Sequence, residues 1–261
     1  MTYTKQYLKK AEEIISIIEK QESTIIEVAN IFAQTILNGR MVHLFGSGHS
    51  RIMVEEMWPR YGSFPGFNPI VELSLSNHNL VIGSNGQRQA MFLENVPNFA
   101  GRILRNFDIK EQDTALIISS SGCNVVPIEM AEELQKLNVK VVALVSSIHL
   151  EGSTSKRKDG KKLTDFADYV LDTGAPLGDA MIKIDGLDTP VAPGSTLGGV
   201  LIINTLKAEI ASVLVQNGKI PKVLSSGKII GDKRAVELFE GAYDEHAHLM
   251  AKLYENVGPK K

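Results

Sequence analysis

The sequence has a single cysteine, no excess of either charge and no long uninterrupted apolar run. Cys123 stands alone among 261 residues, which excludes an intramolecular disulfide and is typical of a reducing cytosol. The 28 basic and 30 acidic side chains give a formal charge of −2, so nucleic acid and anionic membranes are poor partners. We find no apolar stretch near the ~20 residues of a membrane span, and the charged residues 2–20 make no signal peptide. We therefore expect a cytoplasmic protein.

The composition that remains is that of an ordinary globular protein. Hydrophobic residues make up 43% of the chain, and 22 glycines are spread along it. No repeat and no long linker divides the chain, so we expect one domain over residues 1–261. Within it we expect N-terminal helices over 1–38, a sheet core over 39–218 and a C-terminal helical extension over 219–261.

Short β-rich runs alternate with helical segments after the opening helices. This alternation predicts βαβ units and a parallel sheet. The runs around Ile117 and Val142 are apolar without alternation, as strands covered on both faces should be. The expected strands are Met41–Phe45, Ile70–Leu75, Thr114–Ser119, Val139–Val145, Tyr169–Leu171 and Met181–Ile184.

Two long helices are expected near the C-terminus. Ser195–Asn217 is apolar almost all round, which predicts burial or a subunit interface, and Asp232–Asn256 is amphipathic. Together with the terminal helices, this apolar surface favours a homodimer or homotetramer. The basic stretch 156–162 is open to two interpretations, a flap over an anionic ligand or a solvated surface loop.

Two loops that follow predicted strands carry the chemistry, because ligands of open α/β sheets bind at the carboxyl ends of the strands. In the first loop, Gly48, His49 and Ser50 offer close backbone approach and a hydroxyl. It matches neither a dinucleotide fingerprint nor a Walker A motif. The second loop is serine-rich and leads into a helix. Its hydroxyls and the free N–H groups of the helix N-terminus predict a phosphate site that needs no basic residue. Its candidate ligands are Ser119, Ser120, Ser121, Gly122 and Asn124.

These loops resemble those of the sugar isomerase (SIS) domain family, whose members bind phosphosugars. Ser119-x-Ser121-Gly122-x-Asn124 is similar to the family's phosphate loop, and Gly46-x-Gly48-x-Ser50 to its first glycine-rich loop. The resemblance implies the flavodoxin-like SIS fold, a three-layer α-β-α sandwich around a five-stranded sheet. It also implies a small phosphorylated sugar as ligand, with sites near subunit interfaces.

Two subfamilies give different expectations for the reaction. The phosphoheptose isomerase group carries a His-x-x-x-Glu pair where this chain has Glu56 and Arg60, so we expect no metal and no cofactor. The N-acetylmuramic acid 6-phosphate etherase group resembles the chain in Gly194-Ser195-Thr196 and in the glutamate matched by Glu94. On this basis Ser195 and Thr196 are further candidate substrate ligands.

The leading hypothesis is an aldose/ketose phosphosugar isomerase that works through an enediol. Moving a proton next to a carbonyl needs a carboxylate or imidazole of adjusted pKa. Glu56, Glu94 and His49 are the catalytic candidates, and His78 is a weaker one. An amino-sugar phosphate lyase or etherase and a non-catalytic phosphosugar sensor remain as alternatives.

Overall fold

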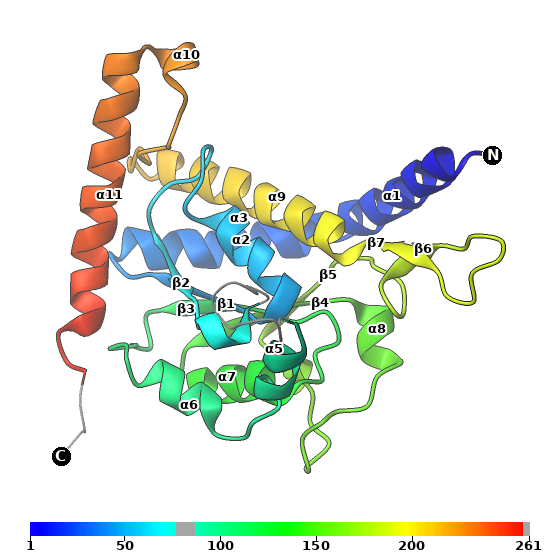
Figure 1. Ribbon diagram of the computed structural model, residues 1–261. Helices are drawn as coiled ribbons and strands as arrows, with labels where there is room; N and C mark the ends of the chain where they lie inside the picture. The colour runs from blue at the N-terminus through cyan, green and yellow to red at the C-terminus, as the bar shows by residue number, and fades with distance from the viewer. Residues whose placement is uncertain (77–86, 258–261) are drawn as a thin grey trace.

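The computed structural model describes residues 1–76 and 87–257. Its centre is a five-stranded sheet in the order β2-β1-β3-β4-β5, in which every neighbouring pair is parallel (Figure 1). These strands are β1 (Val42–Gly46), β2 (Phe67–Ile70), β3 (Thr114–Ile118), β4 (Lys140–Val145) and β5 (Tyr169–Asp172).

Ten α-helices surround the sheet or extend from it in the described part of the chain. They are α1 (Tyr3–Glu19), α2 (Glu22–Leu37), α3 (Arg51–Met57), α5 (Gln87–Leu93), α6 (Phe99–Leu104), α7 (Val125–Lys136), α8 (Ser147–Glu151), α9 (Ser195–Gln216), α10 (Gly227–Ile230) and α11 (Asp232–Tyr254).

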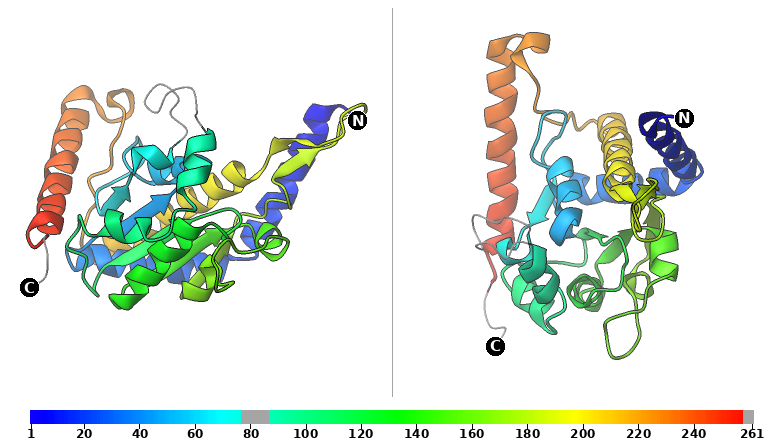
Figure 2. Two further views of the ribbon diagram at one scale, coloured as in Figure 1. Left: turned by 60° about the horizontal axis from the view of Figure 1, so that its bottom comes forward. Right: turned by 45° about the vertical axis from the view of Figure 1, so that its right-hand side comes forward.

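Both faces of the sheet are covered, which explains the unbroken apolar runs in its central strands. Leu116 and Ile118 of β3 join a core cluster with α2, α3 and α9. Ala115 and Ile117 of the same strand point to the opposite face and join a second cluster with α6 and α7. Figures 1 and 2 show these helices on the two sides of the sheet. The predicted three-layer α-β-α sandwich is confirmed.

Two predicted strands lie elsewhere in the structure. The second strand is Phe67–Ile70 rather than Ile70–Leu75, and Leu73–Leu75 is a 3₁₀ turn whose Ser74 N–H donates to Glu72. Pro69 is tolerated because β2 is an edge strand. The predicted strand Met181–Ile184 corresponds to β6 (Ala180–Ile182), which pairs antiparallel with β7 (Val191–Pro193) outside the main sheet.

Helix α9 is less buried than its apolar composition predicts. Ile202, Leu206 and Ile210 are fully covered, whereas Val215 remains 49% exposed. Among the described residues, α9 alone is long and apolar enough to cross a membrane, a test that core helices of soluble proteins also pass. The amine of Lys207 is buried, and it donates to the Glu56 carbonyl and the Ser63 hydroxyl at 2.9 and 3.1 Å. These contacts are those of a core helix.

The C-terminal helix α11 stands along one end of the molecule. Its C-terminal half packs on the sheet layer through Leu249 and Leu253, which form a small cluster with Met41. Its N-terminal half and α10 extend beyond the body (Figure 1). Because Met41 directly precedes β1, the C-terminal half of α11 packs at the amino-terminal ends of the strands.

Candidate functional site

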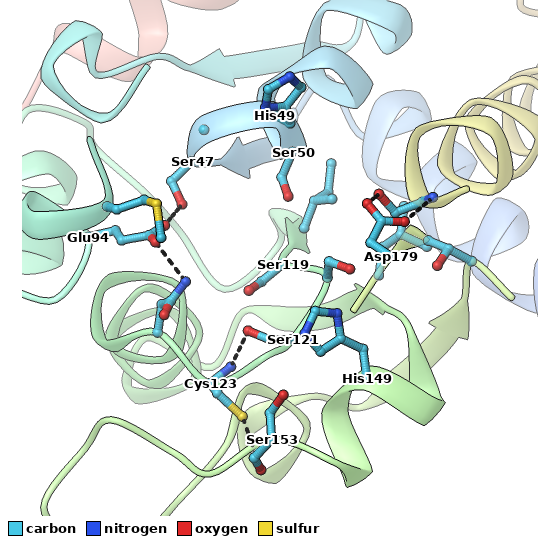
Figure 3. A pocket seen from close by; sticks show the side chains of 18 of the residues that line it. Ser47, His49, Ser50, Glu94, Ser119, Ser121, Cys123, His149, Ser153 and Asp179 are labelled. Atoms are coloured by element: carbon cyan, nitrogen blue, oxygen red, sulfur yellow. Dashed lines mark hydrogen bonds between the residues drawn. The ribbon is translucent and has the colours of Figure 1, made fainter. Parts of the chain in front are cut away.

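A cavity of about 500 Å³ opens at the carboxyl ends of the central strands. The loops after β1, β3 and β4, the end of α5 and the start of α9 all contribute to its wall (Figure 3). The predicted site residues that line it are Gly48, His49, Ser50, Glu94, Ser119, Ser120, Ser121, Asn124, Ser195 and Thr196.

The first loop is a tight 3₁₀ turn, Gly48–Ser50, between β1 and α3. Gly46 makes it possible, because a Cβ atom there would lie 2.6 Å from the Ser50 carbonyl oxygen. The turn places Ser47 on the cavity wall, although it is only 8% exposed. Figure 3 shows the Ser50 hydroxyl pointing toward the cavity, with His49 above it at the rim.

The second loop turns sharply between β3 and α7. Gly122 has φ +60°, a conformation that favours glycine, and a Cβ atom there would lie 2.5 Å from Leu150 Cδ1, so that side chain would have to move. The Gly122 amide donates to the Ser119 carbonyl, and the Cys123 amide donates to Ser121 Oγ. The loop is thereby fixed with its serine side chains along the cavity.

The first turn of α7 differs from the sequence-based expectation of free amides. The Val126 N–H donates to the Glu94 carbonyl at 2.8 Å, and the Val125 N–H donates to Asn95 Oδ1 at 3.4 Å. An anion at this site therefore depends on the serine hydroxyls and loop amides ahead of the helix, with the helix dipole behind them. The expected group of serines is in place, but fewer helix amides are available to a ligand.

Glu94 lies directly after α5 and joins the two loops. Its carboxylate accepts a hydrogen bond from Ser47 Oγ at 2.7 Å and one from Asn124 Nδ2 at 2.8 Å. The side chain lines the cavity, and the residue is 8% exposed. Burial raises the pKa of this carboxyl, while the Ser47 hydrogen bond and the charge of Lys156 partly oppose the increase. A carboxyl group with a raised pKa is suited to exchanging protons.

The N-terminus of α9 is capped by Asp179, a residue that the sequence analysis did not single out. Asp179 precedes β6, and its carboxylate accepts hydrogen bonds from the Gly194 and Ser195 amides and from the Ser195 hydroxyl. Ser195 therefore reaches the cavity with both its polar groups already bonded, and Thr196 lies beside it. No sequence motif could reveal Asp179 as a site residue, because only the folded β6–β7 hairpin brings it next to Gly194.

The basic loop has one residue on the cavity. Lys156 lines the wall next to Cys123, and its amide donates to the Cys123 carbonyl at 2.9 Å. Arg157 instead pairs with Glu132 and Asp159, and Lys162 donates to the Leu150 carbonyl. Arg157 and Lys162 thus serve to hold the loop, while Lys156 lies near the serine loop.

Glu56 is not brought to the cavity. Its carboxylate accepts a hydrogen bond from Asn204 Nδ2 at 2.7 Å and pairs with Arg60. Burial alone would raise the pKa of Glu56, but these partners more than offset it and the pKa is lowered. The weaker candidate His78 lies outside the described residues. Within residues 1–76 and 87–257, no group of three or more His, Cys, Asp or Glu side chains is arranged to hold a metal ion.

Comparison with known proteins identifies the family. The SIS domain matches residues 6–146, more than half of the 261 residues. A UPF0309 protein of Halalkalibacterium halodurans is 34% identical over 226 residues, which cover 86% of this chain and 91% of that protein. A UPF0309 protein of Thermoanaerobacter pseudethanolicus is 31% identical over 258 residues, which cover 96% of this chain and 98% of the relative.

Two solved structures share the fold. Phosphoheptose isomerase from Neisseria gonorrhoeae superposes with a TM-score of 0.51 at 16% identity, over 79% of this chain and 95% of that chain. A phosphoheptose isomerase from Francisella tularensis superposes with a TM-score of 0.50 at 17% identity, over 80% of this chain and 98% of that chain. At such identities the likeness concerns the fold. The sequence match over residues 6–146 shows that the chain belongs to the SIS domain family.

Proposed function

We propose that the protein binds a phosphorylated sugar and interconverts its aldose and ketose forms through an enediol. One observation carries this proposal: the serine loop Ser119–Asn124 and the buried carboxyl of Glu94 face the same cavity. The first supplies an anion site and the second a proton-transfer group. The two structural neighbours are named phosphoheptose isomerases, which is consistent with this reaction class.

The serine loop is suited to a phosphate. Ser119, Ser121 and the first-loop Ser50 bring hydroxyl donors to the cavity, and the N-terminal end of α7 carries a partial positive charge behind them. Lys156 adds a full charge at the wall. A chain of net charge −2 can therefore bind a small anion through local donors without attracting a polyanion.

Glu94 is placed to move the substrate proton. As the base, the carboxylate removes the proton from C2 of the aldose, and the C2–H electron pair becomes the C1–C2 double bond of the enediol. The same carboxyl then delivers a proton to C1, which gives the ketose. The second proton has to move between O1 and O2, and His49 at the rim is our candidate for that transfer.

The test has a binding stage and a turnover stage. Thermal-shift measurements with a panel of pentose, hexose and heptose monophosphates identify the ligand, since a ligand at 100 times its Kd stabilises by about 2.7 kcal/mol. Incubation of that ligand with the protein in D₂O should then place deuterium at C1 or C2.

The results of the two stages distinguish the isomerase from the alternatives. Binding without deuterium incorporation contradicts the isomerase and supports the sensor. Oxygen-18 from water at C3 of an amino-sugar phosphate supports the lyase or etherase. No stabilisation by any sugar phosphate contradicts phosphosugar binding.

We further propose that the protein is a cytoplasmic homodimer or homotetramer. A groove between α1, α2 and α9 supports the assembly, because five of its lining residues are isoleucine or leucine. Two of them, Ile15 and Ile26, are 43% and 40% exposed. Light scattering at micromolar concentration should give at least twice the monomer mass of 28.6 kDa. The monomer mass alone would contradict the assembly.

A further inference from the structure

Two long helices direct their N-termini at the same cavity, and only one of them is capped by a carboxylate. The serine loop lies ahead of α7, whereas Asp179 occupies the start of α9. Helix N-termini attract anions through their amides and their dipole. The protein's own carboxylate therefore takes the place that a second anion would need.

The Asp179 carboxylate is held firmly in this position. Oδ1 accepts hydrogen bonds from the Gly194 and Ser195 amides at 3.1 and 2.7 Å, and Oδ2 accepts one from the Ser195 hydroxyl at 2.6 Å. The Gly194 amide also lies 3.2 Å from the Asp179 carbonyl. Asp179 has φ +60°, a conformation that Asp and Asn adopt more readily than most residues.

The β6–β7 hairpin explains the arrangement. Ala180 pairs with Pro193, so the residues just outside this pair, Asp179 and Gly194, stand face to face. Oδ1 uses both of its acceptor positions, while Oδ2 accepts one hydrogen bond within the described part of the chain. The remaining position on Oδ2 suits a sugar hydroxyl or an ammonium group, and it repels a second phosphate or a carboxylate.

We propose that Asp179 is a specificity-determining residue that restricts the site to monophosphates of uncharged or amino sugars. Figure 3 shows Glu94 and Asp179 on opposite sides of the cavity, with Ser119 and Ser121 between them. A ligand whose phosphate lies on the serine loop thus extends toward a carboxylate. The inference rests on the proposed phosphosugar binding and adds which phosphosugars are excluded.

The experiment measures Kd by calorimetry for two pairs of probes. Fructose 6-phosphate is compared with fructose 1,6-bisphosphate, and glucose 6-phosphate with 6-phosphogluconate. The native chain should bind at least one monophosphate about tenfold or more tightly than its more anionic counterpart. In Asp179→Asn this preference should fall by about tenfold, because the substitution keeps the shape and removes the charge.

Two further variants serve as control and extension. Asp185→Asn removes an equal charge from the exposed loop between β6 and β7, and it should leave the preference unchanged. Asp179→Ala frees the α9 amides as well, so it should favour the bisphosphate more than Asp179→Asn does. Measurable monophosphate binding by Asp179→Asn, at whatever Kd, shows that the fold and the serine loop are intact.

The possible failures are distinguishable. If the native chain binds a monophosphate but the preference is absent, or is the same in Asp179→Asn, the specificity role is wrong and phosphosugar binding stands. If neither the native chain nor any variant binds any of the four probes or the wider monophosphate panel, both proposals are overturned.

Discussion

Two buried carboxylates lie at opposite edges of the same sheet, and their pKa values are shifted in opposite directions. Asp113 stands at the amino-terminal edge, immediately before β3. Arg40 Nε and Nη2 donate to its two oxygens at 2.8 and 2.7 Å, and His43 Nε2 lies 3.3 Å away. Burial would raise its pKa, but these neighbours hold the pKa at about 2.

Glu94 is the contrasting case at the carboxyl edge. It is almost as buried as Asp113, at 8% against 1% exposed, but its hydrogen-bond donors are the neutral side chains of Ser47 and Asn124. Burial therefore prevails and its pKa is raised. The charge of the hydrogen-bond partners makes the difference: Arg40 holds Asp113 ionised, whereas the raised pKa of Glu94 suits it to the proton transfer that we propose.

The largest effect is expected from Glu94→Gln. The amide cannot take or return a proton, so deuterium incorporation should fall by about 10²–10⁴-fold while the sugar phosphate still binds. NMR of the substrate in D₂O measures the rate, and calorimetry measures the binding. The matched control Glu55→Gln changes an exposed glutamate of α3 and should incorporate deuterium at the native rate. Native turnover in Glu94→Gln would contradict the role of Glu94.

Ser121→Asp should have the next largest effect, on phosphate binding. The substitution gives the serine loop a negative charge like the one that Asp179 places at the start of α9. Asp can still accept the Cys123 amide hydrogen bond that Ser121 accepts, so the loop should keep its shape. We expect Kd for the sugar monophosphate to rise about 100-fold, as like charges meet in a half-buried site. The neutral Ser121→Asn should weaken binding less than tenfold. Equal Kd values in the two variants would show that the phosphate binds elsewhere.

Acid unfolding tests the role of Asp113. Since the pKa of Asp113 is lowered from 3.8 to about 2, its ionised form contributes about 2 kcal/mol to the free energy of unfolding. This contribution is fully present above the unfolded pKa and is lost as the pH falls toward 2. Urea unfolding at several pH values should show that loss in the native chain, and Asp113→Asn should lack it. The same pH dependence in both would contradict the account of Asp113.

Glu94 should influence stability with the opposite sign. Its raised pKa means that the folded state binds the proton more tightly than the unfolded state does. The stabilisation is present below the unfolded pKa of 4.5 and is lost as the pH rises through the folded pKa. Native stability relative to Glu94→Gln should therefore decrease between pH 4 and pH 7 in urea unfolding. An increase over that range would contradict the raised pKa.

The smallest effect is expected from Glu56→Gln. Glu56 lies outside the cavity in its pairing with Arg60 and Asn204, so deuterium incorporation should stay within about twofold of the native rate. The same NMR assay measures it. A loss as large as that of Glu94→Gln would return Glu56 to the catalytic candidates.

The sequence allowed prediction of features that depend on local pattern. The apolar runs of β3 and β4 and the loops that follow parallel strands led to the sheet and to Ser119–Asn124. Glu94 was also predicted, through its resemblance to a family motif. The start and end of β2 were not, because its Pro69 is tolerated only at an edge that no local pattern reveals.

Contacts between distant segments could not be predicted. Asp179 meets Gly194 only because a hairpin folds between them. The direction of Glu56 depends on Asn204, which lies 148 residues away. Likewise, the Val126 amide is occupied by the Glu94 carbonyl, a bond that the pattern of a serine-rich helix start does not show.

Amide NMR during titration with a sugar monophosphate tests the central claim most directly. If the phosphate binds at the serine loop, the largest chemical-shift changes should fall on the amides of Ser119–Asn124, with smaller changes at Ser47–Ser50 and Glu94. Asp113, at the opposite edge of the sheet, should show little change. Saturable changes centred on any other part of the chain, with Ser119–Asn124 unaffected, would contradict the assignment of this cavity as the phosphosugar site.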